Sequence, residues 1–243
     1  MAGPQGRPGP GHNRLLAILP PASRERLLAS CELVNLERDS ILVRAGDPID
    51  YVYFPQSAVI SLLIMMADGS SVESATIGFE GMVGAPLVLG DEVSPYDVTV
   101  QLGGDALRIP AASLRRLMDE DPTLRSVLLR YVEVLLVQMA RNTACNRLHD
   151  LEERLARWLL HIHDWVWANR FPLTHDFVAR MLGVRRPSVT VAARSLAREG
   201  LIQYRHGRVT IRDREGLEDL ACEDYVIVRD AFERLLPLPP EST

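Results

Sequence analysis

Short apolar runs separated by turn residues fill the first half of the chain. Between Glu32 and Ile109 these runs alternate with glycine, proline and aspartate. Two of them, 59–66 and 71–77, are joined through Asp68-Gly69, a dipeptide typical of tight hairpin turns. Many short strands at turn-sized spacing favour an antiparallel barrel or jelly roll. We therefore expect an N-terminal domain of this antiparallel kind over residues 13–120.

The pattern changes to helical spacing after Ala111. Asp121-Pro122 is a helix start signal, with aspartate as the N-cap and proline in the first turn. Between Val127 and Ala140 almost every residue is apolar, so this long helix needs cover on more than one side. Two arrangements provide such cover: the same helix of a second copy of the chain, or burial of a central helix within one copy.

A further helix is expected from Asp150, because Glu153 follows three residues later as in a capping box. Residues 146–150 then form a hinge, and the long helix with its hinge occupies 121–149. A separate domain is predicted over 150–236. The segments 1–12 and 237–243 are predicted to be tails, the first because it is rich in glycine and proline and cannot bury a core.

Residues 173–188, which read LTHDFVARMLGVRRPS, predict two short helices. Thr174 is a suitable N-cap for the first, and Gly183 suits the turn that follows, because glycine accepts a positive φ. Pro187 falls in the first turn of the second helix, where its missing N–H costs little. Residues 201–211 predict a two-stranded hairpin, or wing. A winged helix-turn-helix is therefore expected in the C-terminal domain, and the fold class is α+β.

The distribution of charge along the chain indicates what the C-terminal domain binds. All 27 basic residues are arginine, and the whole chain has a net charge of −5. Residues 170–214 nevertheless contain ten arginines against three acidic residues, Asp176, Glu199 and Asp213. A basic block in an acidic protein indicates a local surface for a polyanion, and with a winged helix-turn-helix it indicates duplex DNA.

The N-terminal end of the second helix of such a motif faces base edges in the major groove. Arg186 is the first candidate for base reading, because a guanidinium can donate two hydrogen bonds to guanine. The other arginines, with Thr174, are expected to contact phosphates. The alternative is that these arginines form an ordinary solvated surface. The predicted DNA-binding residues are Thr174, Arg185, Arg186, Ser188, Arg194, Arg205 and Arg208.

Several classes of protein are disfavoured by what the sequence lacks. No uninterrupted apolar run is long enough to span a membrane. Three cysteines are too few for a disulfide framework, so a cytoplasmic protein with reduced thiols is expected. A glycine-rich phosphate loop, a recognisable Ser-His-Asp arrangement, HExxH and CxxC are all missing, so we expect no enzyme.

The chain resembles the Crp/Fnr superfamily of bacterial transcription regulators over residues 13–236. The resemblance rests on 44–62 (RAGDPIDYVYFPQSAVISL), on the helix 121–146 and, most specifically, on 173–190 (LTHDFVARMLGVRRPSVT). It implies a cyclic-nucleotide-binding-like β-roll that acts as a sensor, a long dimerisation helix and a winged helix-turn-helix. The predicted dimer residues are Leu124, Leu128, Tyr131, Leu135, Gln138 and Asn142.

Two departures from the family pattern limit what the resemblance implies. Pro187 replaces a Glu that is common in the family, so the cytosine contact of that Glu is missing. Members that bind cyclic nucleotides hold the phosphate with a Gly-Glu pair and a following Arg. Here Gly84 precedes Ala85-Pro86, and no Arg lies between Arg44 and Arg108. Because a buried phosphate needs a cationic partner, we expect no binding of cAMP or cGMP in the family manner.

The remaining ligand candidates in the β-roll are Glu80, Gly81 and Gly84, although the first two also suit a turn after Gly78. The cysteine cluster of the iron–sulfur branch is missing near the N-terminus, and we expect no cofactor and no metal. Cys145 is expected to be a buried structural thiol, with a redox switch as the alternative, because no strong basic neighbour is visible in the sequence.

The sequence thus predicts a homodimeric, sequence-specific DNA-binding transcriptional regulator that reads an inverted repeat with the helix 185–199. The alternative is a ligand-binding signalling module whose winged domain contacts protein. The expected partners are double-stranded DNA, a second copy of the chain, RNA polymerase and an unidentified small-molecule effector, and no membrane is expected among them.

Overall fold

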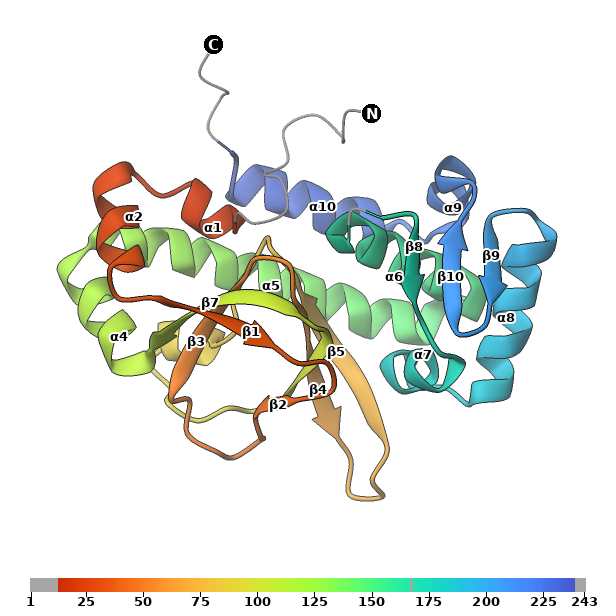
Figure 1. Cartoon of the computed structure of the whole chain (residues 1–243), viewed down its shortest axis with the longest axis horizontal. Coiled ribbons are helices and arrows are strands. Elements are labelled where there is room, and N and C mark those ends of the chain that lie inside the picture. The colour runs from red at the N-terminus through yellow and green to blue at the C-terminus, as the bar shows by residue number, and fades with distance from the viewer. Residues whose placement is uncertain (1–12, 167, 239–243) are drawn as a thin grey trace, which may run out of the picture. The chain divides into compact units, whose positions relative to one another are not determined.

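A computed structural model describes residues 13–166 and 168–238 (Figure 1). The expected tail 1–12 lies outside the described residues, as does most of the expected tail 237–243. The chain folds into two compact units. The N-terminal unit draws its described residues from 1–62, 75–137 and 230–243, and the C-terminal unit consists of 63–74 and 138–229.

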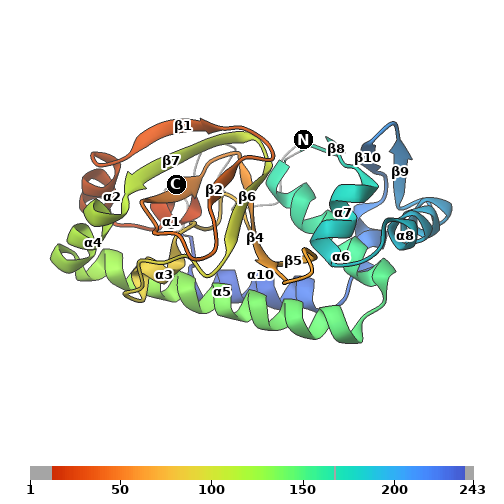
Figure 2. The same cartoon turned by 90° about the horizontal axis from the view of Figure 1, so that it is seen from below.

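Two antiparallel sheets form most of the N-terminal unit, as the sequence predicts (Figure 2), and only the segment 63–74, with one end each of β4 and β5, is assigned to the other unit. Alternate strand residues fill the space between the sheets, so that Val52, Phe54, Ile60, Val100 and Ile109 have no exposed surface. One sheet has the order β1 (Glu32–Leu36), β7 (Gly104–Pro110), β3 (Tyr51–Pro55). The other has the order β2 (Ile41–Val43), β6 (Asp97–Leu102), β4 (Val59–Met65), β5 (Ser71–Ile77).

Short helices close this unit: α1 (Arg14–Ala17), α2 (Pro21–Leu28), α3 (Ala85–Val88) and α4 (Ala111–Glu120). Asn13 caps α1 by accepting the Leu15 N–H at 3.0 Å. Its amide also donates to the carbonyl of Gly81 at 2.7 Å. Arg14 is 5% exposed and donates to the Leu236 carbonyl at 2.8 Å. The beginning and the end of the described chain are therefore fastened together.

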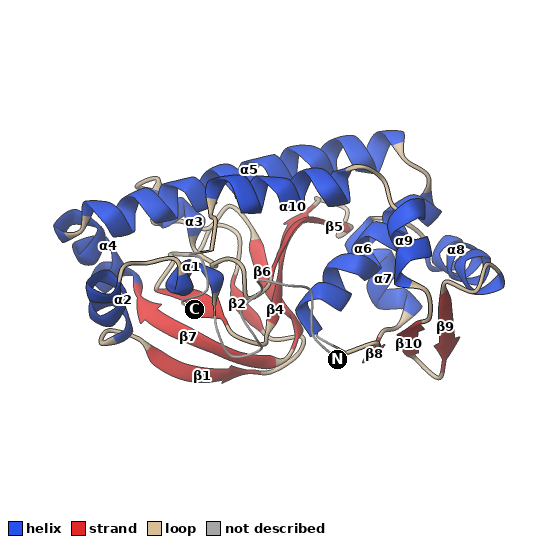
Figure 3. Cartoon of the chain, turned by 90° about the horizontal axis from the view of Figure 1, so that it is seen from above, coloured by secondary structure: helices blue, strands red, loops and turns tan. Residues whose placement is uncertain are grey.

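The long helix α5 (Pro122–Leu148) begins as predicted, because Oδ1 of Asp121 accepts the N–H of Thr123 at 3.0 Å. Its Tyr131 donates to the Met82 carbonyl at 2.9 Å. This approach requires glycine at position 81, since a Cβ there would lie 2.6 Å from the Tyr131 hydroxyl oxygen. The last helix, α10 (Asp224–Leu235), runs beside α5, and Arg234 lies 3.9 Å from Glu133 (Figure 3).

The C-terminal unit contains α6 (Leu151–Val166), α7 (His175–Leu182), α8 (Arg186–Arg198) and α9 (Arg214–Leu220). The Asp150 N–H donates to Glu153 Oε2 at 3.0 Å, as the capping box predicts. The wing has three strands instead of two, in the order β8 (Arg170–Pro172), β10 (Arg208–Ile211), β9 (Ile202–Arg205). The short strand β8 was missed because three residues are too few to show a period.

No helix among the described residues combines the length and the apolar character that a membrane span requires.

Candidate nucleic-acid interface

The turn between α7 and α8 is fixed by two local features of the sequence. The Thr174 hydroxyl accepts the Phe177 N–H at 3.3 Å and so caps α7. Gly183 has a φ of 63° in the left-handed region, and the Val184 N–H donates to the Ala179 carbonyl at 3.0 Å. A glycine in this conformation ends α7 and lets α8 start after a short turn.

Two faces of α8 differ sharply in exposure. Val189, Ala192, Ala193 and Leu196 are buried and hold the helix against the rest of the unit. The opposite face carries Arg185, Arg186, Ser188 and Arg194, all exposed. The predicted base-reading residues therefore lie together at the N-terminal end of a helix that is anchored along its other side, and the geometry matches a recognition helix.

Arg186 lies within reach of one acidic side chain in the first helix of the motif. Its Nε is 3.5 Å from Oδ1 of Asp176, and the two side chains are 65% and 69% exposed. An ion pair this exposed is worth little free energy, at most about 1 kcal/mol. Asp176 can therefore orient the guanidinium without holding it in place.

His175 braces the recognition helix, a role that the sequence did not reveal. The Thr190 hydroxyl donates to the Arg186 carbonyl at 3.2 Å, so the His175 Nδ1–H donates to Thr190 at 2.9 Å. The imidazole also stacks on the Tyr204 ring, with 4.3 Å between centroids. Tyr204 in turn donates to the Leu173 carbonyl at 2.6 Å. One histidine thus connects α7, α8 and the wing.

Burial lowers the pKa of His175 below its usual value of 6.5, and the nearby charges of Arg186 and Arg194 act in the same direction, while Asp176 opposes them. The folded chain therefore binds this proton less tightly than the unfolded chain. Neutral His175 therefore stabilises the folded state. This contribution to the free energy of unfolding is complete above pH 6.5 and is lost as the pH falls through the lowered pKa of His175.

We expect the His175→Gln variant to lose less thermal stability than the wild type between about pH 7 and about pH 5. Glutamine can still donate to Thr190 but does not titrate. Thermal unfolding followed by circular dichroism measures the difference, and the other titrating groups cancel in the comparison. Parallel pH dependences of the two proteins would show that His175 titrates as it does in the unfolded chain.

One face of the wing sheet is strongly cationic. Arg170, Arg205, Arg208 and Arg212 line a hollow there, together with Gln203 and Thr210. The opposite face is apolar, and its Phe171 and Val209 are at most 1% exposed. Alternation along the strands separates the two faces. Arg205 and Arg208 were predicted as phosphate contacts, whereas Arg170 and Arg212 were missed because their place on this face depends on β8 and on the end of β10.

Removing both missed arginines in an Arg170→Ala/Arg212→Ala variant should weaken binding to all DNA sequences alike. The slope of log K against log salt should become shallower by about 2, because each lost phosphate contact contributes about 0.9. Fluorescence anisotropy across a salt series measures the slope. Arg24→Ala, an exposed arginine of α2, serves as the control and should leave the slope unchanged. An unchanged slope in the double variant would remove these arginines from the interface.

Comparison with known proteins supports this reading of the C-terminal unit. The Crp-like helix-turn-helix domain matches residues 153–220, and the cyclic nucleotide-binding domain matches residues 33–121. The chain belongs to the Crp/Fnr family of transcriptional regulators. Its helix-turn-helix is a DNA-binding motif of that family.

Individual relatives are distant but cover most of the chain. The transcriptional regulator SdrP of Thermus thermophilus is 24% identical over 199 residues, which are 76% of this chain and 95% of SdrP. The structure of FixK2 from Bradyrhizobium japonicum superposes with a TM-score of 0.68 at 15% identity, covering 79% of this chain and 98% of FixK2. The c-di-GMP-responsive regulator CLP of Xanthomonas campestris gives a TM-score of 0.65 at 18% identity, covering 78% of this chain and 98% of CLP. At these identities the structures establish the fold.

The face of α5 that the sequence predicted for dimerisation is covered by this Crp/Fnr chain itself. Asn142, for example, donates to the Ser74 carbonyl at 2.8 Å. The exposed apolar residues are instead Leu129 and Leu136, which are 43% and 59% exposed. The residues predicted to contact a second copy are thus buried within one copy of the chain. The apolar pattern of α5 could not show which side of the helix packs inward. The six predicted residues, each at most 8% exposed, are Leu124, Leu128, Tyr131, Leu135, Gln138 and Asn142.

The predicted ligand residues of the β-roll have packing roles in this family member. Oε1 of Glu80 accepts the Gly78 N–H at 3.2 Å and closes the turn. Gly81 admits Tyr131, as described above. Gly84 has a φ of 110°, and a Cβ there would lie 2.7 Å from a methyl group of Val52. Gly84 alone of the three lines the cavity of the β-roll.

That cavity is small and apolar. It has a volume of about 20 Å³, which is room for about one water molecule. Its lining includes Tyr51, Ser94 and Tyr96 but no charged side chain. Arg108 is engaged elsewhere, because its Nη2 lies 2.6 Å from Glu32. Nothing that lines the cavity could neutralise a cyclic phosphate.

Cys145 is fully buried, as expected, and a second thiol lies next to it. Cys222 lies beside it, with 3.4 Å between the two sulfurs, and lowers the pKa of Cys145 to about 6. Arg157 acts on Cys145 in the same direction. Neither neighbour was visible in the sequence, because Arg157 lies on α6 and Cys222 lies 77 residues away along the chain.

Proposed function

We propose that the chain is a homodimeric regulator that binds an inverted repeat in duplex DNA, with one α8 helix reading each half-site. The exposed group Arg185, Arg186 and Ser188, at the N-terminal end of a helix anchored by Val189, is the observation that carries this proposal. In helix-turn-helix proteins this end of the second helix contacts base edges.

The contacts divide into base reading and positioning. Arg186 donates two hydrogen bonds to the O6 and N7 atoms of a guanine, and its pair with Asp176 aligns it in the free protein. The side chain of Pro187 has no group that could accept a hydrogen bond from the amino group of a cytosine. Phosphate contacts fix the register of the protein on DNA without reading sequence. They come from Thr174, Arg170, Arg194, Arg205, Arg208 and Arg212.

The second copy of the chain docks on the exposed face of α5. Leu129, Glu133, Leu136 and Ala140 are exposed and follow one another at spacings of four, three and four residues. Alternating spacings of three and four form the seam of a two-stranded coiled coil. Reading two half-sites that are one turn of DNA apart requires the two copies of α8 to lie about 34 Å apart in this dimer.

The proposed regulator does not use cAMP in the family manner. The cavity of the β-roll holds about 20 Å³ and has no cationic lining, whereas drug-sized ligands occupy pockets of roughly 300–1,000 Å³. An effector of a different kind and RNA polymerase stay predictions that rest on the family resemblance.

Selection from genomic DNA tests the proposed function. The purified chain is incubated with sheared genomic fragments at about 150 mM salt, with and without cAMP, and the retained fragments are sequenced. We expect one enriched inverted repeat, the same in both arms. Enrichment only with cAMP would overturn the independence from cAMP. Retention without any shared sequence would overturn specific reading, and no retention in either arm would favour a winged domain that contacts protein.

A further inference from the structure

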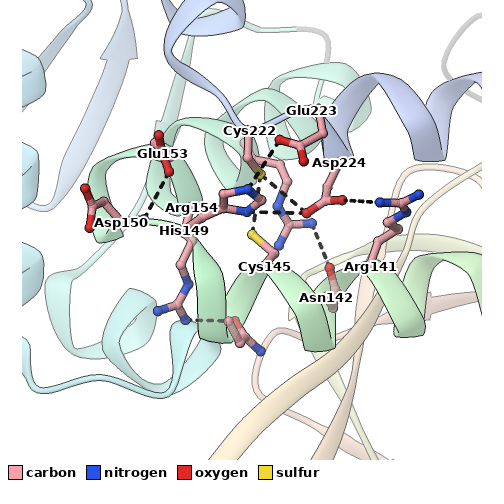
Figure 4. Close-up of polar contacts among 12 residues, drawn as sticks. Arg141, Asn142, Cys145, His149, Asp150, Glu153, Arg154, Cys222, Glu223 and Asp224 are labelled. Carbon is pink, nitrogen blue, oxygen red and sulfur yellow. Dashed lines mark hydrogen bonds and ion pairs between the residues drawn. The ribbon is translucent and has the colours of Figure 1, made fainter.

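Four side chains with metal-binding atoms converge in the C-terminal unit (Figure 4). Cys145 lies in the last turns of α5, and His149 follows directly after its end. Cys222 precedes α10, and Asp224 is the first residue of that helix. The candidate ligand atoms of all four lie within 4.8 Å of one another.

Local geometry explains the convergence. Cys145 and His149 are four residues apart, and the His149 N–H donates to the Cys145 carbonyl at 3.2 Å, so both side chains project from the same face. Cys222 and Asp224 also point to one place, with 3.8 Å between the thiol and the carboxylate. The cluster thus joins the corner between α5 and α6 to the start of α10.

Two polar atoms in this cluster are buried without a hydrogen bond. They are Oδ1 of Asp224 and Nδ1 of His149. Asp224 is only 1% exposed, and its nearest charged neighbours are 3.5 Å away: Arg141 at one oxygen and His149 at the other. Buried polar atoms that make no hydrogen bond destabilise a fold. A cation bound between the carboxylate and the imidazole would give Nδ1 of His149 the partner that it lacks, while Oδ1 of Asp224 would stay beside Arg141.

The sulfur separation favours a shared metal ion over a disulfide. The two sulfurs are 3.4 Å apart. Zn–S bonds of about 2.3 Å in a tetrahedral site place two thiolates about 3.8 Å apart. A disulfide requires about 2.05 Å. A disulfide would also leave the nearby carboxylate and imidazole unexplained, whereas two thiolates, one imidazole and one carboxylate complete a four-coordinate site.

The surroundings fit the same conclusion. Nε2 of His149 lies 3.3 Å from Glu223, and metal-bound histidines commonly donate their second ring N–H to a carboxylate. Nδ1 is then the nitrogen that faces the ion. The charges of Arg141 and Arg157 lie close by and offset the negative charge of the ligands.

We propose that Cys145, His149, Cys222 and Asp224 form a closed tetrahedral site for one zinc ion per chain. Such a site leaves no open coordination position and is structural in kind. It fastens the corner between α5 and α6 to α10 within the DNA-binding unit. This inference does not depend on the proposed DNA sequence reading.

Metal content of the full-length chain tests the site. The protein is purified under reducing conditions without chelators from cells supplied with zinc, and metal is measured by elemental analysis. We expect close to one zinc per chain. Cobalt added to the metal-stripped chain should give the visible bands of tetrahedral cobalt and a near-ultraviolet thiolate-to-cobalt transition. Cys145→Ser and Cys222→Ser should each weaken that transition, because one thiolate is left in either variant, whereas Cys31→Ser, outside the cluster, should leave it unchanged.

Two milder variants keep the test informative where a serine variant fails to fold. His149 is 19% exposed at its side chain, so His149→Gln is expected to fold and to bind zinc at least about 100-fold more weakly. Glu223→Gln should weaken binding by about 10-fold to 100-fold and leave the cobalt spectrum tetrahedral. A folded, reduced wild-type chain that takes up neither zinc nor cobalt would overturn the proposal. Metal binding that is equal in wild type and Cys145→Ser would do the same, as would a Cys145–Cys222 disulfide whose reduction restores no metal uptake.

Discussion

Replacing Leu136 with aspartate is expected to produce monomers and to abolish operator binding. Leu136 is 59% exposed in the middle of the proposed seam on α5. A twofold axis brings the two copies of this residue together, so each dimer would acquire a pair of facing carboxylates. Facing like charges cost several kcal/mol, and each 1.4 kcal/mol is about tenfold in affinity. We expect dimerisation to weaken by at least about 100-fold. Sedimentation velocity measures it directly.

Leu33→Asp is the matched control for this substitution. Leu33 is a leucine of β1 that is 67% exposed, so the same change there should leave both the dimer and DNA binding intact. Leu135→Asp is unsuitable, because Leu135 is 5% exposed and lines the cavity of the β-roll, where a charge would unfold the unit. A Leu136→Asp protein that sediments as a dimer would move the interface to another surface.

The Arg186→Ala variant should bind its operator more weakly by about 1–3 kcal/mol, or about 5-fold to 150-fold. The loss should be confined to one guanine position in each half-site. Alanine removes both donors to that guanine while Pro187 and Ser188 keep the start of α8 in place. Binding to a panel of operators with each base pair changed in turn measures where preference is lost. At the affected position, the variant should bind all four base pairs alike.

Arg198→Ala is the control at the opposite end of α8. Arg198 is exposed, but it lies in the last turn, away from the end that enters the groove. We expect this variant to keep the base preferences of the wild type at every position. Uniform weakening of all operators by Arg186→Ala would reassign Arg186 to a phosphate.

The recognition of the C-terminal unit from sequence succeeded because its signals are local. A capping threonine, a glycine at a left-handed turn and a proline in the first turn of α8 each act within a few residues. The same local character explains the correct start of α5 at Asp121. Local signals also sufficed for the β-roll, where a hairpin dipeptide and short apolar runs indicate strands.

The orientation of α5 could not be predicted in this way. Its sequence is apolar nearly all round, so periodicity does not distinguish the side that packs on the chain from the side that stays exposed. Tyr131 points inward because its hydroxyl donates to the Met82 carbonyl and because Gly81 leaves room for its ring. Both partners lie about 50 residues away in the sequence. The predicted dimer face was therefore the buried one, and the exposed face carries Leu129 and Leu136.

The cysteine and histidine cluster was missed for a related reason. Each half of it, Cys145 with His149 and Cys222 with Asp224, is too short to resemble a metal motif. Only folding brings the halves together, across 77 residues. The role of His175 was equally hidden, since its partners Thr190 and Tyr204 belong to other elements.

The distance between half-sites tests the central claim, that a dimer reads an inverted repeat with two α8 helices. Binding is measured to the selected operator, to a single half-site and to operators with about five or about ten base pairs inserted at the centre. An insertion of half a turn places the half-sites on opposite faces of the DNA, so we predict that it reduces affinity to that of a single half-site. Equal affinity for the natural operator and the half-turn insertion would contradict the claim.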